Sequence, residues 1–470
     1  MKIANALLPL SMLLLSGCVV GPNYQVPPPL VPAKFSKSET PAGNVTLNPW
    51  WQAFRDKRLD SLVAQGMNQN LDVLQSLERI NEARANVVIA GAGGLPQVNA
   101  SADGNVQGSD GSYLRRQSGV SHTETKSLSA GGDASWLIDL FGQYRRARES
   151  ANASLDAAYN DINVARLAYL SDLVTSYIDA RYNQEALALA KLSLSSRRET
   201  LKLTNDIRTA GAASSLDVVQ AEGLVNSTLA ELPAYETGFR QAANHIATLL
   251  GLPANSVTAE LTRGTAQPWP RYDTKIGIPA DLVRNRPDIR AAERRLAAAT
   301  AQIGVAEARL YPSLSLSGSI NASRTFGDTA TGNLTSWGFG PTLDIPIFNG
   351  GERRAQVAAN RSAAQQQYLT WKQTVLDAIE DVENALIALR KNYETVAALR
   401  RLVTSYEQAL GLARESYRGG ATSLLDVLDA ERTLSQSRIQ LAAAIRSLAA
   451  NYVALNVAIG GGSSVEVASK

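Results

Sequence analysis

The sequence is poor in the residues on which most enzyme sites depend. It has a single cysteine, Cys18, and two histidines, His122 and His245, that lie far apart along the chain. With no cysteine beyond residue 18, the remainder of the chain forms no internal disulfide. Two distant histidines also argue against a histidine-based zinc site or catalytic triad. No metal, cofactor or catalytic residue is therefore expected, and an enzyme is the least favoured class of protein.

Excess charge and long apolar runs are also lacking. The 46 basic and 43 acidic residues nearly cancel, to a net charge of +3, and no basic cluster indicates nucleic-acid binding. Beyond the N-terminus no run of 18 apolar residues occurs, so the body of the chain is not expected to cross a membrane by helices. Only a closed β-barrel would allow it to span a bilayer. Aromatic residues make up only 6% of a chain rich in alanine, which favours closely packed helices.

The N-terminus is where the one cysteine stands. A short apolar stretch, Ile3–Leu15, leads into Leu15-Ser16-Gly17-Cys18, which resembles a bacterial lipoprotein signal. This pattern predicts that residues 1–17 are a signal peptide and that Cys18 is acylated, in the manner of a palmitate-bearing lipoprotein. Val19 is not acidic, which resembles sorting to the outer membrane. The alternative is a chance cysteine in an ordinary signal peptide. Residues 18–47, rich in proline, are expected to form an extended tether.

The chain contains an internal repeat. Residues 211–222, GAASSLDVVQAE, match residues 420–431, GATSLLDVLDAE, at eight of twelve positions. Asn70–Pro96 also aligns without a gap to Arg286–Pro312. The spacing of about 200 residues exceeds the 20–50 residues typical of solenoid repeats. We therefore expect two copies of one large unit, over residues 48–260 and 261–470, the second including the C-terminal tail.

Four stretches alternate strictly between apolar and polar residues, which predicts strands with one apolar and one polar face. They are Pro96–Gln107, Ser127–Leu140, Ser313–Ala322 and Thr335–Ile347. They form one hairpin in each repeat, about 96–140 and 313–347. Each strand has the length that a tilted membrane strand needs, and Trp136 and Trp337 are candidate membrane-interface anchors. Because four strands cannot close a barrel, we expect three chains to form a single barrel of twelve strands together. The alternative is a pair of soluble hairpins packed on a core.

Long tracts free of proline and glycine follow each hairpin. Gln143–Ala210, Glu352–Leu410 and Ala421–Ile459 have apolar positions spaced by three and four residues, which indicates coiled-coil helices. The first would be ~100 Å long. Gly211 and Gly420 are expected to end the long helices in left-handed turns, about 211–217 and 419–426, and a serine, Ser214 or Ser423, to cap the helix that follows. These tracts alone also fit a long soluble helical bundle. Pro233, Gly251–Pro253 and Gly264–Pro279 are expected to mark a less regular middle between the two repeats.

Taken together, these features resemble the TolC-type outer-membrane efflux channels, in the lipoprotein branch typified by OprM and NodT. The resemblance covers nearly the whole chain. It rests on the lipoprotein signal and on motifs that occur in the expected order, namely Gly21-Pro22-Asn23-Tyr24, Trp50-Trp51, Leu59-Asp60, Arg286-Pro287-Asp288-Ile289, Tyr311-Pro312, Ile345-Pro346-Ile347-Phe348 and the two Gly…Leu-Asp-Val turns.

The resemblance implies a mainly α-helical fold with a β-barrel portion. It implies a homotrimer with a 12-stranded transmembrane β-barrel, four strands per chain, continued by a long α-helical coiled-coil tunnel in the periplasm. It further implies that a periplasmic adaptor (membrane fusion) protein and an inner-membrane pump open the narrow end of the tunnel. Drugs or other toxic small molecules would then leave the cell through a passive duct, as in antibiotic resistance.

The resemblance also implies which residues gate the duct. At matching positions of the family, carboxylates form rings at the narrow end, and a tyrosine and an arginine link neighbouring helices. These positions are Asp217, Tyr417, Arg418, Asp426 and Asp429. Charge-assisted hydrogen bonds of ~1.5–3 kcal/mol each would hold the end closed. The alternative is that Asp217 and Asp426 only cap their helices.

Two other classes of function compete with an export duct. A coiled-coil envelope lipoprotein could act as a spacer without a pore, but a spacer has no need of ten-residue strands with a polar face. An envelope enzyme would need a nucleophile or metal motif. The sequence contains neither motif beyond the single cysteine at position 18.

Overall fold

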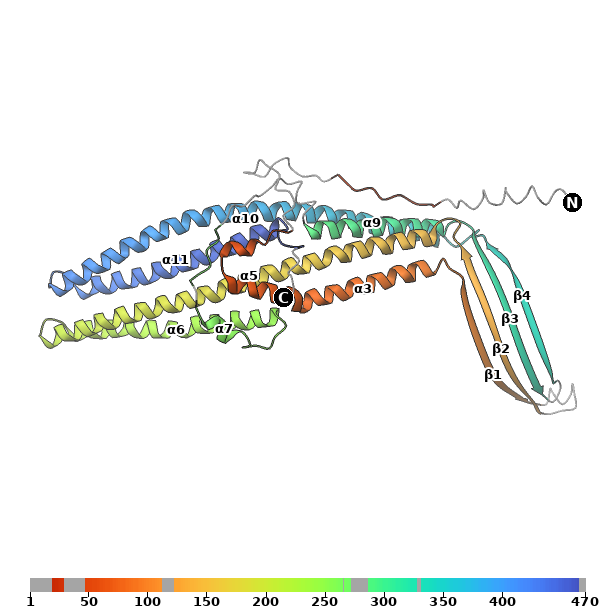
Figure 1. Ribbon diagram of the computed structural model, residues 1–470, viewed down its shortest axis with the longest axis horizontal. Helices are drawn as coiled ribbons and strands as arrows, with labels where there is room; N and C mark the ends of the chain where they lie inside the picture. The colour runs from red at the N-terminus through yellow and green to blue at the C-terminus, as the bar shows by residue number, and fades with distance from the viewer. Residues whose placement is uncertain are drawn as a thin grey trace. The chain divides into compact units, whose positions relative to one another are not determined.

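The structure, a computed structural model, describes residues 19–28, 47–111, 122–264, 266–271, 286–327 and 331–464. Cys18 lies outside them. The chain is mostly helical with one small sheet (Figure 1). The helices are η1 Trp50–Phe54, α2 Lys57–Gln69, α3 Leu71–Ala92, α5 Gln143–Thr209, α6 Ser215–Leu249, α7 Thr258–Thr262, α9 Pro287–Ala308, α10 Glu352–Arg418 and α11 Leu424–Ala458, and the strands are β1 Gln97–Asp110, β2 His122–Ile138, β3 Ser313–Gly327 and β4 Gly332–Asp344.

Two compact units make up the chain. The sheet unit contains the N-terminal segment up to Pro27 together with Ile80–Ala158 and Ala292–Trp371. The helical unit contains the other residues, Pro28–Arg79, Tyr159–Ala291 and Lys372–Lys470. Both repeats contribute to each unit, so the units do not correspond to the repeats.

The sheet unit is built around four antiparallel strands in the order β1-β2-β3-β4. The two hairpins come from different repeats and meet where β2 pairs with β3. Among the described strands, β1 pairs only with β2 and β4 only with β3, so both edges of the sheet are open. The sequence prediction of two long hairpins is confirmed, and the structure adds that they form one continuous sheet.

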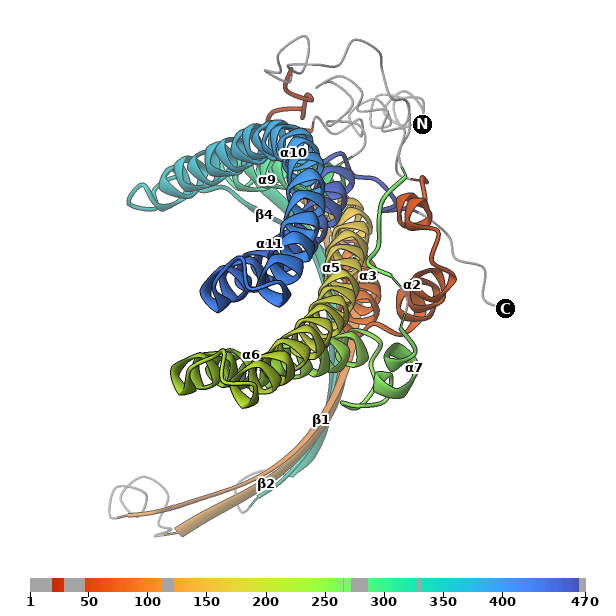
Figure 2. The same ribbon diagram turned by 90° about the vertical axis from the view of Figure 1, so that its left-hand side faces the viewer.

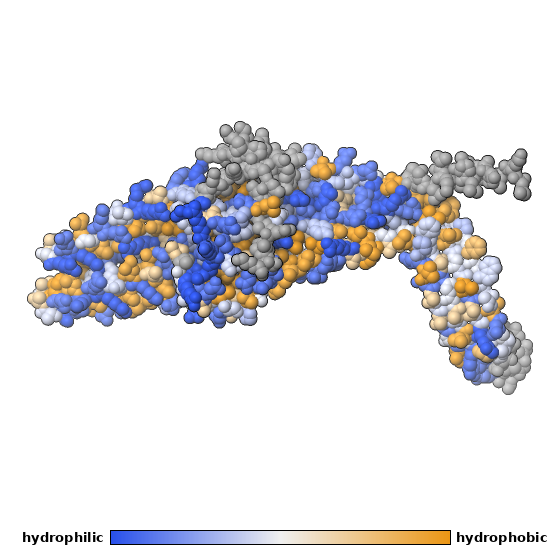
Figure 3. Space-filling view, in the orientation of Figure 1, coloured by the Kyte–Doolittle hydropathy of each residue, from blue (hydrophilic) through white to orange (hydrophobic). Residues whose placement is uncertain are grey.

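The register keeps the apolar residues of all four strands on one face. Val98 lies opposite Ala134, Ala134 opposite Gly318, and Gly318 opposite Phe339. A slip of one residue would mix the two faces, so this pattern specifies the pairing strongly. Val98 is 77% exposed and Phe339 is 82% exposed, and apolar residues stand at the surface of the sheet in Figure 3. The apolar face is therefore uncovered within the chain.

The opposite face of the sheet is polar. The Asn99 amide donates to the Asp133 carboxylate at 3.1 Å, and the Ser129 hydroxyl donates to the Asp103 carboxylate at 2.7 Å. These cross-strand hydrogen bonds satisfy polar groups on a face that suits contact with water. One face fits lipid and the other fits an aqueous lumen.

A short N-terminal segment, Val19–Pro28, lies against the start of α5. The Arg146 guanidinium donates to the carbonyl oxygens of Val20 and Gly21, each at 3.1 Å, and to the side-chain oxygen of Asn23 at 2.8 Å. The Val20 N–H donates to the Phe141 carbonyl at 3.2 Å. Only 4% of the Arg146 side chain is exposed. A buried cation thus holds the residues that directly follow the predicted lipidation site.

The helices of the two repeats have equal lengths. Both α5 (Gln143–Thr209) and α10 (Glu352–Arg418) have 67 residues, and both α6 (Ser215–Leu249) and α11 (Leu424–Ala458) have 35. Each helix of the second repeat begins 209 positions after its counterpart, so equivalent residues of these helices are 209 positions apart. One sequence expectation was wrong for these helices, because Pro233 does not interrupt α6, which continues through it. Helix α10 continues through Gly411 and ends at Arg418, directly before the predicted break at Gly419 and Gly420.

In the helical unit, aromatic residues of η1 pack on the end of α11. The Trp50 indole N–H donates to the Gly461 carbonyl at 3.1 Å, and the Tyr452 hydroxyl donates to the Trp50 carbonyl at 3.2 Å. Phe54 and Tyr452 meet edge to face. The C-terminal glycine-rich turn therefore has a structural role, since the Gly461 carbonyl supplies the acceptor that lets the Trp50 indole be buried.

Helix α11 is the one helix in the described ranges that is long and apolar enough to cross a membrane by length and average composition. Half of its most apolar window is buried inside the helical unit, as is typical of a core helix. The packing of α11 within the helical unit accounts for the apolar composition of this helix, so no membrane is needed to explain it.

Candidate functional site: the helical turns and the seam beside them

The two repeats each bend once, where a long helix turns back into a shorter one (Figure 2). The chain reverses at Gly211, with φ +83°, and at Gly420, with φ +73°. The hydrogen bonds are the same in both turns. The N–H of Gly211 donates to the Arg208 carbonyl at 2.9 Å, and the N–H of Gly420 donates to the Tyr417 carbonyl at 3.1 Å. Only glycine adopts this left-handed backbone without steric cost, so each turn requires its glycine.

A capping box starts the helix after each turn, with Ser214 and Ser423 as the N-cap residues and Asp217 and Asp426 at the third helical position. The Asp217 carboxylate accepts from both the N–H and the hydroxyl of Ser214, each at 2.8 Å. The Asp426 carboxylate accepts from the N–H and the hydroxyl of Ser423, at 3.1 and 2.7 Å. Hydrogen bonds from Thr422 and then Ser423 hold the pKa of Asp426 below its usual value. The capping role is therefore present in both turns, and a gating role for these carboxylates remains a prediction.

The third predicted carboxylate, Asp429, lies one turn further along α11. It accepts from the Arg432 guanidinium at 2.5 Å, and both side chains are more than half exposed. An exposed pair at this spacing contributes at most ~1 kcal/mol. Its main effect is to offset the negative charge of Asp429 locally.

Tyr417 and Arg418 take different positions at the end of α10. Tyr417 is buried in an apolar cluster that includes Leu410, Leu424 and Val427, and its hydroxyl has no hydrogen-bond partner within the described part of the chain. Arg418 is exposed, and among the described residues no hydrogen bond or ion pair joins it to a predicted aspartate. Among the described residues, the links that the family resemblance implies are thus not made.

A groove of about 370 Å³ runs between α6 and α11 near the turns. It is lined by Gln220, Gly223, Leu224, Ser227, Leu425, Leu428, Asp429 and Arg432. Each wall mixes apolar and polar residues, and the α11 wall carries the Asp429–Arg432 pair. The groove is therefore an open surface for a further element rather than an enclosed ligand cavity.

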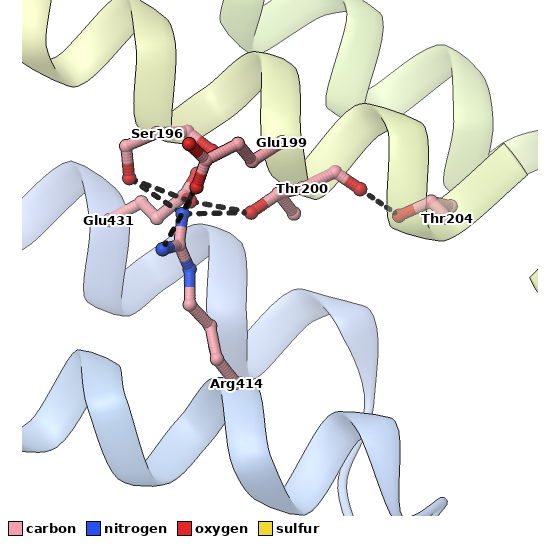
Figure 4. Close-up of polar contacts among 6 residues, drawn as sticks. All are labelled: Ser196, Glu199, Thr200, Thr204, Arg414 and Glu431. Atoms are coloured by element: carbon pink, nitrogen blue, oxygen red, sulfur yellow. Dashed lines mark hydrogen bonds and ion pairs between the residues drawn. The ribbon is translucent and has the colours of Figure 1, made fainter. Parts of the chain in front are cut away.

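A polar cluster that the sequence analysis did not predict lies between the helical hairpins α5–α6 and α10–α11. It is here called the Arg414–Glu431 cluster (Figure 4). Arg414 of α10 donates to the Glu431 carboxylate of α11 at 2.6 Å and to the Ser196 carbonyl of α5 at 2.8 Å. The Thr200 hydroxyl, also of α5, donates to the same carboxylate oxygen of Glu431 at 2.6 Å. Three helices from both repeats thus meet at one carboxylate.

The carboxylate of the Arg414–Glu431 cluster is buried, and its arginine is half-buried. The Glu431 side chain is 2% exposed and that of Arg414 25% exposed. A second cation, Arg197 of α5, donates to the Thr228 hydroxyl of α6, and burial lowers the pKa of Arg197 despite the nearby Glu431. Removing one partner of a buried ion pair costs more than the pair contributes, because the other charge is left without compensation. The cluster therefore specifies how α5 sits against α10 and α11.

The remaining predicted site residues lie away from the turns. Trp136 at the end of β2 is 37% exposed, and its indole N–H donates to the Gly94 carbonyl at 3.0 Å. Trp337 of β4 is 74% exposed and lies opposite Ile320. Both positions are compatible with a membrane interface, which remains a prediction, as does lipidation of Cys18. Among the described residues no group of three His, Cys, Asp or Glu side chains is placed to hold a metal ion.

Comparison with known sequences gives matches along nearly the whole chain. A family profile described as "Outer membrane efflux protein" matches residues 62–252 and 278–461. Nodulation protein T of Rhizobium leguminosarum bv. trifolii is 51% identical over 464 residues, which is 98% of each chain. The two profile matches lie one in each half of the chain.

Comparison with solved structures gives the same fold. The outer-membrane channel OprN superimposes with a TM-score of 0.83 at 31% sequence identity, covering 95% of this chain and 100% of that one. The open state of the MtrE outer membrane channel of Neisseria gonorrhoeae superimposes with a TM-score of 0.81 at 27% identity, covering 96% of this chain and 100% of that one.

Proposed function

Because the chain belongs to the outer membrane efflux protein family, we propose that it forms the outer-membrane channel of a tripartite export system. In this proposal three copies form a passive duct for drugs or other toxic small molecules. A periplasmic adaptor protein and an inner-membrane pump complete the system. The relatives are channel proteins, and the proposal assigns the chain no catalytic step.

The observation that carries the proposal is the open sheet with one uncovered apolar face. Unpaired backbone groups at a sheet edge are not tolerated in lipid, so β1 and β4 must find partners. Bacterial barrels start at about eight strands, more than one chain supplies. Three copies supply twelve strands, with the polar face turned to the lumen.

The internal repeat predicts how neighbouring copies pair. Gln97 of β1 lies opposite Ser135, and its repeat equivalent Ser313 lies opposite Asp344. The β2–β3 pairing within the chain should therefore recur as a β4–β1 pairing between chains. Ala130 lies opposite Ala322 within the chain, so their repeat equivalents, Phe339 and Val106, should lie opposite each other across the boundary between copies. This register also keeps both residues on the apolar face.

Disulfide cross-linking tests this assembly directly, because Cys18 is the only native cysteine. The double variant Phe339→Cys/Val106→Cys should give covalent trimers when the membranes are oxidised. The matched variant Phe339→Cys/Gly104→Cys is displaced by two residues, which puts the sulfurs too far apart. Efficient cross-linking of the Phe339→Cys/Gly104→Cys variant alone would support the trimer but contradict the predicted register between β4 and β1. No covalent or non-covalent trimer in either variant would reject the channel.

The turns are proposed as the gate of the duct. In a trimer, three copies each of Asp217, Asp426 and Asp429 would form carboxylate rings, of which the Asp429 ring is partly offset by Arg432. The net negative charge would attract cations with several kT of local potential. Tyr417 and Arg418 would reach a neighbouring copy, which would also satisfy the buried Tyr417 hydroxyl. Tyr417→Phe with Arg418→Ser should raise the conductance of single channels in a planar bilayer. Unchanged conductance would reject these two residues as gate contacts.

The lipid anchor and the partner surface complete the proposal. Acylation of Cys18 would tether the chain to the outer membrane in addition to the barrel. Two signals of this kind give firmer anchoring than one. The groove between α6 and α11 is the proposed surface for a helical segment of the adaptor.

A further inference from the structure

Residues 266–271 form a short extended segment that lies on the helical hairpin of the second repeat, α10–α11. The Gln267 side-chain amide donates to a backbone carbonyl of α11 at 2.9 Å. The Trp269 ring meets the Tyr393 ring of α10 edge to face, with the ring centroids 5.8 Å apart. The Arg400 guanidinium, also of α10, lies 4.6 Å from the centroid of the Trp269 ring. The prolines on either side of Trp269 are buried. This hairpin therefore binds a tryptophan between an aromatic ring and a cation.

The internal repeat places an equivalent groove on the hairpin of the first repeat, here called the α5–α6 groove. Residues of these helices that are 209 positions apart are equivalent, so Tyr393 and Arg400 correspond to Gln184 and Lys191 of α5. Both Gln184 and Lys191 line a groove of about 440 Å³ between α5, α6 and α7. The two positions that hold the Trp269 ring in the second repeat thus border an open groove in the first.

The α5–α6 groove is less covered than its counterpart. Leu187 of α5 and Phe239 of α6 line it, and each is only partly buried. Their equivalents in the second repeat, Val396 and Leu448, are 1% and 0% exposed. Helix α7 borders the groove without filling it. The first repeat therefore leaves apolar surface uncovered where the second repeat carries its own aromatic segment.

The charges of the α5–α6 groove also suit an aromatic ring. Lys191 takes the place of Arg400, and either cation attracts the face of an indole. Arg240 of α6 adds a second cation, and Glu236 supplies the one carboxylate among the lining residues. Among the described residues, neither Lys191 nor Arg240 forms a hydrogen bond or an ion pair. Both cations are therefore available to a bound partner.

We propose that the α5–α6 groove binds an extended segment of a partner protein that presents a tryptophan between prolines, as residues 266–271 do on α10–α11. The occupant comes from a different protein, because the corresponding segment of every copy already lies on the α10–α11 hairpin of its own chain. The indole of the partner would pack on Leu187 and Phe239, with the Lys191 ammonium over its ring. The groove lies within the helical unit of one chain, so the inference does not depend on the proposed trimer.

Disulfide exchange with short peptides tests this site, because Cys18 is the only native cysteine. Ala188→Cys places a thiol at an exposed position of the groove. The purified full-length variant is equilibrated under mildly reducing conditions with the peptide Cys-Ala-Gln-Pro-Trp-Pro, or with its counterpart Cys-Ala-Gln-Pro-Ala-Pro. The tryptophan peptide should form about ten times more adduct, because burial of its ring stabilises that disulfide. The native protein reports any adduct at Cys18.

The internal repeat supplies the matched control. Ala397 is the equivalent of Ala188 and is also exposed, but it stands on the hairpin that Trp269 already occupies. Ala397→Cys should therefore form equal amounts of the two adducts. Adding Lys191→Met to Ala188→Cys keeps the apolar stem and removes the cation, so the preference for tryptophan should fall about threefold.

A preference for the tryptophan peptide at Ala188→Cys and none at Ala397→Cys would support the inference. Equal adducts of the two peptides at Ala188→Cys would overturn it. So would the same preference at Ala397→Cys, because it would reflect a general attraction of tryptophan to the helical surface. An unchanged preference after Lys191→Met would overturn the arrangement proposed for the ring.

Discussion

Replacing Arg146 with methionine should release the N-terminal segment from the sheet unit. The substitution keeps the apolar stem and removes the hydrogen bonds to Val20, Gly21 and Asn23 of the segment. It also removes the ion pair with Glu149 on α5 at 2.7 Å, which does not hold the segment itself. Bonds from a charged donor contribute ~1.5–3 kcal/mol each, but the buried guanidinium also loses hydration in the native protein. We therefore expect the net loss to be about 3 kcal/mol. That corresponds to roughly a hundredfold faster opening of the segment.

Amide hydrogen exchange of the purified protein measures this opening at Val20, whose N–H donates to the Phe141 carbonyl. The control is Arg145→Met, one residue earlier, where the side chain is 47% exposed and contacts Asp139. That variant should leave exchange at Val20 unchanged. Equal exchange rates in Arg146→Met and the native protein would refute the reasoning, because the segment would then be held by packing alone.

Two further predictions concern the turns. Gly211→Ala and Gly420→Ala should each lower the free energy of unfolding by ~1–2 kcal/mol in denaturant titrations, because a side chain is strained at positive φ. The control Gly223→Ala, within α6, should not destabilise the protein, because the added methyl group meets no neighbouring atom. A larger loss of stability in the Gly223 variant than in the two turn variants would contradict this reasoning. The second turn should weaken in acid. The lowered pKa of Asp426 means that its contribution is complete above the usual aspartate pKa and is lost as pH falls through the lowered value, so exchange of the Ser423 amide should accelerate there. Asp426→Asn should remove that dependence, and an unaltered acid response in the variant would disprove it.

Most of the sheet could be predicted from the sequence, because the alternation of apolar and polar residues lies within each strand. Strict alternation requires only that one face differ from the other, and the register then follows from keeping Val98, Ala134 and Gly318 on one side. The sequence did not reveal that β2 pairs with β3, since that contact joins residues almost 200 positions apart. The helices were predicted from the same kind of local periodicity. The expected irregularity at Pro233 was wrong, because α6 continues through this residue.

The site was only partly predictable. Gly211 and Gly420 follow from turn chemistry, and the capping aspartates follow from their spacing to Ser214 and Ser423. Arg414 could not be identified in this way, because on a long helix its neighbours do not distinguish a buried arginine from a solvated one. The one available signal was the repeat itself: Glu431 has an equivalent glutamate and Arg414 does not. Arg146 presents the same problem beside Arg145, since only the fold decides which of the two is buried.

The equal lengths of the paired helices restrict how this chain can vary. Each long helix has 67 residues and each returning helix 35, so both turns lie the same number of helical turns from the sheet. Seven residues added to α5 alone would extend one hairpin by ~10 Å and rotate its apolar face by ~20°. Seven added to α5, α6, α10 and α11 together would preserve the match. The lengths of these four helices can therefore change only together. A viable longer or shorter variant should carry compensating insertions or deletions at equivalent positions.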